Sequence, residues 1–239
     1  MSSVNILSGG AAQGLVGSLT PAFKAQTGFE IAGEFGAVGV MADKLRKGAP
    51  ADIVVLTAAL VAKLAAEQLV LATSIADVGL VETALAVRTG DPQAAVNDAA
   101  DLREALQASD AIYVPDTKAS TAGIHVANVL QQLGIADEVA ARLRIFPNGA
   151  TAMRELAASE ARRPIGCTQS TEIISTKGVT LSGSLPPACE LATMYTAGIT
   201  AAAAHPQQAQ HLIDLLTGAA QHEQRKRAGF ISARSQART

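Results

Sequence analysis

The sequence predicts an α/β protein with a mostly parallel β-sheet. Short apolar runs alternate with helical patterns from the N-terminus onward, and this alternation favours parallel strands joined by helices. The continuous apolar run Ile53–Leu56 is typical of a strand buried on both faces. A chain of 239 residues accommodates one large α/β domain or two lobes of about 100 to 120 residues each.

The composition restricts the class of partner. Hydrophobic residues make up 49% and aromatic residues 3% of the chain, so aliphatic side chains must fill the core. The net charge is −2 with both signs dispersed, which indicates no nucleic-acid partner. No apolar run approaches the roughly 20 residues that span a bilayer. We expect a monomer that binds a small molecule.

Two cysteines, Cys167 and Cys189, are too few for a disulfide scaffold and lack the spacing of a metal site. We therefore expect neither a metal nor a cofactor. Cys167 falls in a predicted buried strand, where it acts as a small apolar filler. A predicted strand at Val4–Leu7 follows the first residues at once, so we find no signal peptide. The expected location is cytoplasmic, or periplasmic if a leader has been removed.

The first part of the chain predicts three strands, each followed by a loop and a helix. The strands are expected at residues 4–7, 29–35 and 53–56, and the helices at residues 15–23, 40–45 and 58–69. In a parallel sheet the ligand binds beyond the carboxyl ends of the strands, and glycine lets backbone amides approach it closely. Tight turns alone would also explain these glycines. The expected binding residues at this edge are Gly9, Gly10, Ala11, Ala37, Val38 and Thr57.

A second group of candidate residues lies in the stretch Ala111–Gly134. The apolar run Ala111–Val114 ends at Pro115, and a helical pattern from Ile124 to Leu133 precedes Gly134, a typical C-cap. The loop between them brings hydroxyls and one ammonium to a helix N-terminus, where unpaired N–H groups attract an anion. The alternative is an ordinary Ser/Thr N-cap. These loop residues are Thr117, Lys118, Ser120 and Thr121.

The remaining chain adds further elements and donors. An extended segment is expected at residues 78–87, helices at 102–108, 136–143, 152–158, 206–216 and 221–228, and strands at 145–147, 165–169, 179–181 and 194–200. Thr151 precedes one helix, and Thr168, Gln169 and Ser170 join a strand to another. The polar tail from Ser232 is expected to fray.

Several motifs together resemble the molybdate-binding-like branch of the periplasmic solute-binding proteins. They are Gly48–Asp52 before an apolar strand, the loop Phe35–Gly39, Gly183–Pro186 before a long strand, and a closing helix followed by Arg225–Phe230. The resemblance covers nearly the whole chain. It implies the type 2 periplasmic-binding-protein-like fold, with two α/β lobes, a ligand between them and an ABC transporter permease as partner.

The resemblance also implies a division of the chain. Lobe 1 would contain residues 1–80 and 197–239, and lobe 2 residues 81–196. The two crossings would lie near Val78–Val87 and Gly183–Gly198.

The chain departs from molybdate binders at the ligand. Such proteins use serine hydroxyls where this sequence has Gly10 or Ala11 and Val38, and a tyrosine where it has Gln169-Ser170. Each missing hydrogen bond would cost roughly 1–3 kcal/mol, so two losses lower the affinity about a hundredfold or more. The remaining hydroxyls and one lysine suit an organic anion, such as a di- or tricarboxylate.

An enzymatic alternative stays open, because this branch includes proteins similar to aconitate isomerases. An allylic proton shift needs a general base, a general acid and a pocket that stabilises the anion. The candidate proton carriers are Lys118, His125 and Glu172. Each also has a structural interpretation: a counter-ion, a satisfied histidine and a carboxylate at a helix start.

Overall fold

The computed structural model describes residues 2–232, which form two compact units. Unit 1 takes the chain up to Val81 and again from Thr193, and unit 2 takes Glu82–Ala192. The sequence had placed these boundaries after residues 80 and 196. The first boundary falls after Val81 because this side chain belongs to the core of unit 1. The second falls at Thr193 because the strand Ala192–Ile199 pairs with Ile53–Thr57 of unit 1 from Tyr195 onward.

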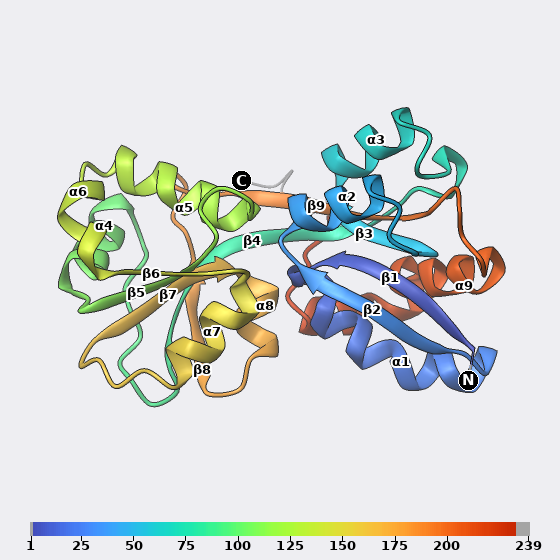
Figure 1. Ribbon diagram of the computed structural model, residues 1–239. Helices are drawn as coiled ribbons and strands as arrows, with labels where there is room; N and C mark the ends of the chain where they lie inside the picture. The colour runs from blue at the N-terminus through green and yellow to red at the C-terminus, as the bar shows by residue number, and fades with distance from the viewer. Residues whose placement is uncertain (1, 233–239) are drawn as a thin grey trace. The chain divides into compact units, whose positions relative to one another are not determined.

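In unit 1 the strands follow the order β2-β1-β3-β9, with the start of β4 beside β9, and helices cover both faces of the sheet (Figure 1). β1 pairs in parallel with β2 and β3, and β9 runs antiparallel to β3. Its elements are β1 Ser3–Gly9, η1 Gly10–Ala12, α1 Gln13–Thr27, β2 Glu30–Gly36, α2 Val38–Arg46, β3 Ile53–Thr57, α3 Ala58–Ala66, η2 Ala72–Ser74, β9 Ala192–Ile199, α9 Pro206–Thr217, η4 Ala219–Gln221 and α10 His222–Arg227.

Unit 2 is built on the order β4-β7-β5-β6, with β8 also paired to β4. β5 is parallel to β6 and β7, whereas β4 is antiparallel to β7 and β8. Its elements are β4 Ala76–Arg88 (which starts in unit 1), α4 Ala99–Ala108, β5 Ala111–Pro115, α5 Thr121–Gln132, α6 Ala136–Val139, η3 Ala140–Arg142, β6 Leu143–Phe146, α7 Gly149–Ala157, β7 Pro164–Gln169, α8 Ser170–Ser175 and β8 Val179–Ser184.

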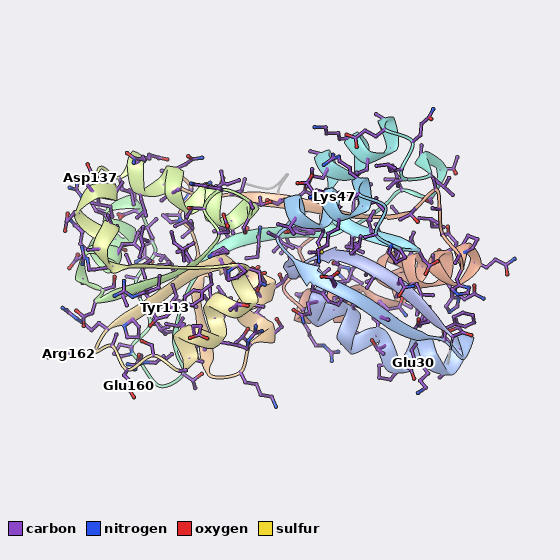
Figure 2. The ribbon with its side chains drawn as sticks, in the orientation of Figure 1. Glu30, Lys47, Tyr113, Asp137, Glu160 and Arg162 are labelled. Atoms are coloured by element: carbon purple, nitrogen blue, oxygen red, sulfur yellow. The ribbon has the colours of Figure 1, made fainter. Side chains whose placement is uncertain are left out.

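Each unit has its own aliphatic core, as the composition predicted. Helices α4, α5 and α6 cover one face of the unit 2 sheet, and α7 and α8 cover the other (Figure 1). Tyr113 stacks on Phe146 with ring centroids 5.9 Å apart, and its hydroxyl donates to Ser159 Oγ at 2.9 Å. Lys47, Asp137, Glu160 and Arg162 are exposed on the outsides of their units (Figure 2).

The α/β prediction is confirmed, and most elements fall where expected. Three details were wrong. The helix expected at residues 136–143 ends early, because Leu143 already pairs with Ile112 as the start of β6. The helix expected to reach residue 69 ends at Ala66, since Gln68 takes a left-handed φ of 59°. The crossing expected at Gly183–Gly198 is not one extended segment, because residues 185–191 lie outside any strand. The tail predicted to fray lies, from residue 233, outside the described residues.

Asp52 ties the separate segments of unit 1 together. Its side chain is 1% exposed and accepts from the backbone N–H of Asn5 and of His205, both at 2.7 Å. Asn5 lies in β1, and His205 is the N-cap residue of α9, so one carboxylate joins the start of the chain to its C-terminal segment.

We expect Asp52→Ala to lower the free energy of unfolding by about 2–4 kcal/mol, because two N–H groups lose their acceptor. Urea denaturation of both variants and the wild type provides the measurement. Asp43→Ala is the matched control, since Asp43 is exposed and, among residues 2–232, its carboxylate forms an ion pair with Arg46 alone, on its own helix. Equal losses in the two variants would contradict this role for Asp52.

Candidate functional site

In unit 1, the carboxyl ends of β1, β2 and β3 meet at one edge of the sheet. The parallel registers place Gly9 beside Gly36 and Ser8 beside Val55. Each strand turns into a helical element within one residue of its end. The structure therefore brings one predicted group of residues together at this edge: Gly9, Gly10, Ala11, Ala37, Val38 and Thr57.

The helix starts at this edge are uncapped. No side chain caps η1, α1, α2 or α3, and none of them carries an acidic residue in its first turn. The first N–H groups of a helix have no intrahelical partner, and they mark the positive end of the macrodipole. These N–H groups would stabilise a negative charge placed at this edge.

Gly9 allows close packing at the same edge. A Cβ atom on Gly9 would lie 2.7 Å from Val38 Cγ1 and 2.8 Å from Tyr195 Cε1. Any larger residue would displace the side chains of Val38 and Tyr195. Ser8, the nearest serine, is fully buried, and its hydroxyl donates to the carbonyl of Gly9 at 2.9 Å. It does not replace the serine that molybdate binders carry in this loop.

In unit 2, the loop between β5 and α5 lies at the carboxyl end of β5 and carries the second group of predicted donors. The Asp116 carboxylate accepts from the N–H groups of Lys118 and Ala119 at 2.7 and 2.9 Å, and this turn shapes the loop. Ser120 is the N-cap residue of α5 but makes no side-chain capping bond. The Lys118 side chain is exposed and forms no ion pair within the described part of the chain. The ordinary N-cap interpretation therefore does not account for these groups.

Glu172 provides an internal hydrogen-bond acceptor beside α7. Its carboxylate is 5% exposed by residue, accepts from the Thr168 hydroxyl at 2.6 Å, and accepts from the backbone N–H groups of Gln169, Ala150 and Gly149. Desolvation by burial is the largest effect and raises the pKa of this carboxyl above its usual value, although the hydrogen bonds act in the opposite direction. A Cβ on Gly149 would lie 1.9 Å from Glu172 Oε2, so only glycine fits there.

Two other predicted residues, Thr151 and His125, have local partners. Thr151 Oγ1 accepts from Arg154 at 2.9 Å, and its N–H donates to Asn148. His125 Nε2 lies 2.8 Å from the carbonyl oxygen of Cys189. Burial raises the pKa of the Cys167 thiol to about 12, so this cysteine stays protonated as expected of a core residue.

Three buried side chains near the carboxyl end of β7 have no partner for their polar atoms. They are Gln169, whose Nε2 and Oε1 are both unpaired, and Thr83 and Thr171, whose Oγ1 atoms are unpaired, in the described part of the chain. The sequence pointed to Gln169 but not to Thr83 or Thr171. Thr83 is found only through strand register, because it pairs with Gln169 across β4 and β7.

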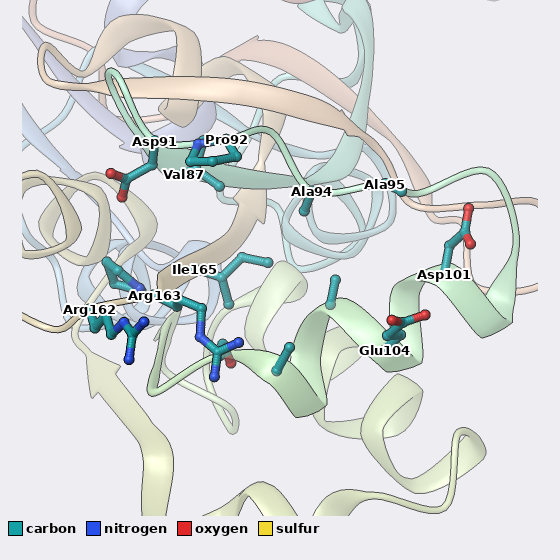
Figure 3. A pocket seen from close by; sticks show the side chains of 14 residues that line it. Val87, Asp91, Pro92, Ala94, Ala95, Asp101, Glu104, Arg162, Arg163 and Ile165 are labelled. Atoms are coloured by element: carbon teal, nitrogen blue, oxygen red, sulfur yellow. The ribbon is translucent and has the colours of Figure 1, made fainter.

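A cavity of about 390 Å³ lies elsewhere in unit 2 (Figure 3). Pro164 and Ile165, which line it, begin β7, whereas the predicted donors Thr168, Gln169 and Ser170 lie at the opposite end of that strand and just beyond it. Its wall also includes Asp91, Glu104 and Arg162. The cavity is separate from the predicted binding residues.

Within residues 2–232, no three His, Cys, Asp or Glu side chains are grouped in a way that could hold a metal ion. In the same residues, none of the helices has the length and apolar character needed to cross a membrane.

The pH dependence of stability tests the state of Glu172. An acid whose pKa is raised by folding stabilises the protein most below its unfolded pKa, about 4.3, and loses this contribution as the pH rises through the folded pKa. We expect the unfolding free energy of the wild type, relative to Glu172→Gln, to fall from pH 4 to pH 8. Urea titrations across this range measure the difference. If this difference rises with pH instead, the hydrogen bonds from Thr168 and the backbone amides lower the pKa of Glu172 by more than burial raises it.

Comparisons with known proteins agree with this architecture. A protein described as aconitate isomerase from Pseudomonas sp is 24% identical over 227 residues, covering 90% of this chain and 82% of that protein. The periplasmic molybdate-binding protein of Azotobacter vinelandii has a TM-score of 0.78 at 20% identity, covering 96% of this chain and 99% of that one. The sulfate-binding protein SubI of Mycobacterium tuberculosis H37Rv has a TM-score of 0.74 at 18% identity, covering 98% and 88%. Residues 4–231 match the family described as bacterial extracellular solute-binding protein, and the chain belongs to that family.

Proposed function

We propose that this protein binds a small organic anion, a di- or tricarboxylate, and delivers it to an ABC transporter permease. The observation that carries the proposal is the group of uncapped helix starts at one edge of the unit 1 sheet, none with an acidic residue in its first turn. Oriented N–H groups of this kind bind anions without a cationic side chain. Lys118 and the hydroxyls of the α5 loop supply further donors in unit 2.

The donor set favours carboxylates over tetrahedral oxyanions. The positions that carry serine in molybdate binders are Gly10 or Ala11 and Val38, and Ser8 donates to a backbone carbonyl. A tetrahedral oxyanion would leave oxygens unpaired in a buried place, which costs affinity. A carboxylate is planar and spreads its charge over two oxygens, so separate carboxylates of one ligand can use separate helix starts.

An isomerase is the second candidate, favoured by the similarity to the Pseudomonas protein named aconitate isomerase. Of the three candidate proton carriers, Glu172 is held by Thr168 and backbone amides, and His125 is bonded to a backbone carbonyl. Lys118 alone of these three has an exposed side chain without an ion pair in the described residues. A single group would have to remove and return the proton, so we favour binding without chemistry.

A ligand panel separates these functions. We expect citrate, tricarballylate and the aconitate isomers to raise the melting temperature in a concentration-dependent way, and molybdate and sulfate to raise it less at equal concentration. Ultraviolet absorbance after mixing with cis- or trans-aconitate should stay constant. A larger shift with molybdate would overturn the carboxylate proposal, and interconversion of the isomers would establish the isomerase instead.

Lys118→Ala tests the contribution of unit 2. A hydrogen bond to a charged group contributes about 1.5–3 kcal/mol, so we expect the affinity for a bound carboxylate to fall roughly tenfold or more. Isothermal titration calorimetry measures the change. Lys177→Ala is the matched control, since Lys177 is an exposed lysine of the same unit that follows α8. An unchanged affinity in Lys118→Ala would remove this residue from the site.

A further inference from the structure

Gln169 is the most unusual polar residue of unit 2. It is 2% exposed, yet both its amide nitrogen and its amide oxygen lack a hydrogen-bond partner in the described residues. Buried amides are almost always paired, because an unpaired donor or acceptor costs the desolvation of that group. The partner of this amide is therefore a group outside the described residues, either an ordered water or a ligand.

The position of Gln169 connects it to the candidate site. It ends β7 and is the N-cap residue of α8. Through the parallel registers β5–β7 and β5–β6, this strand end shares a sheet edge with the loop before α5, which carries Lys118. Gln169 itself was one of the donors expected from the sequence.

Thr83 extends the unpaired group across the sheet. It faces Gln169 in the antiparallel register of β4 and β7, so the two side chains lie on the same face. The N–H of Thr83 donates to Leu191 and its carbonyl accepts from Leu185, which makes this a non-hydrogen-bonded pair whose side chains approach closely. Thr171 adds a third unpaired hydroxyl, two residues beyond Gln169.

The chemistry of an amide decides what kind of partner fits. Nε2 needs an acceptor and Oε1 needs a donor, and exchanging the two atoms leaves the same pair of requirements. An ionised carboxylate, sulfate or molybdate offers acceptors only, so it would satisfy Nε2 and leave Oε1 unpaired. A hydroxyl group offers both a donor and an acceptor. The threonine hydroxyls can pair with either kind of group.

We propose that the preferred ligand is a hydroxycarboxylate whose hydroxyl donates to Gln169 Oε1 while a ligand oxygen accepts from Gln169 Nε2. This inference rests on the proposed function, because it assumes that an organic anion binds at this edge. Gln169 would select for a hydroxyl group on the ligand, because its Oε1 accepts a hydrogen bond. Backbone N–H groups and Lys118 only donate, so they cannot recognise a hydroxyl hydrogen. A site built to pair a hydroxyl discriminates strongly against the analogue that lacks it.

Matched ligand pairs test this selectivity. Citrate and tricarballylate differ by one hydroxyl, as do malate and succinate. We expect calorimetry of the wild type to show at least tenfold tighter binding of the hydroxylated member of at least one pair. Equal affinity within both pairs would overturn the inference while leaving the carboxylate proposal intact. Binding of molybdate or sulfate with no binding of any carboxylate would overturn both.

Gln169→Met tests the residue itself. Methionine keeps the length of the side chain and removes both polar atoms, so we expect the discrimination within the responsive pair to fall below threefold. The melting temperature without ligand should stay equal or rise, because no unpaired amide remains buried. Gln107→Met is the matched control, since the Gln107 amide donates to Glu138 and Gln107 is not among the predicted binding residues, so the discrimination should stay unchanged. Discrimination that persists in Gln169→Met, or a large fall in its melting temperature, would overturn the assignment.

Discussion

Helix N-termini impose the constraint on which this structure depends. Each helix begins with N–H groups that have no intrahelical acceptor, and parallel strands bring these helix starts to the same edge of a sheet. In unit 2, Glu172 provides an acceptor from within the protein for the start of α7. In unit 1, no side chain does so at η1, α1, α2 or α3. The amides at the start of α7 have a side-chain acceptor, whereas those at the helix starts of unit 1 have none. This contrast is our reason for proposing an external anion.

Small residues make this arrangement possible. Gly9 leaves room for Val38 and Tyr195, and Gly149 leaves room for the Glu172 carboxylate. In both places the missing side chain lets another group come against the backbone. Gly9 keeps the edge of unit 1 tightly packed. Gly149 brings the Glu172 carboxyl group within reach of the start of α7.

Membership of the extracellular solute-binding protein family fits an anion site but does not by itself select the ligand. The structural relatives bind molybdate and sulfate by name, and the Pseudomonas relative is named for aconitate. The donors of this chain separate these choices. Its first loop and the loop before α2 lack serine hydroxyls. Gln169, Thr83 and Thr171 bring groups that both donate and accept and that have no partner within residues 2–232. This pattern is the basis for proposing a hydroxylated organic anion.

The sequence by itself determined the α/β class, most of the elements and the loops that follow the parallel strands. These features depend on local signals: apolar periodicity, Pro115 at a strand end, and glycine between strand and helix. The tertiary structure alone decided how the polar groups are used. Thr168 and Glu172 were both read as available groups, yet they bond to each other, while Thr83 gained importance only through its register with Gln169. Hydrogen-bond pairing depends on which distant residues meet across the sheet, and the spacing of residues along the chain does not encode that directly.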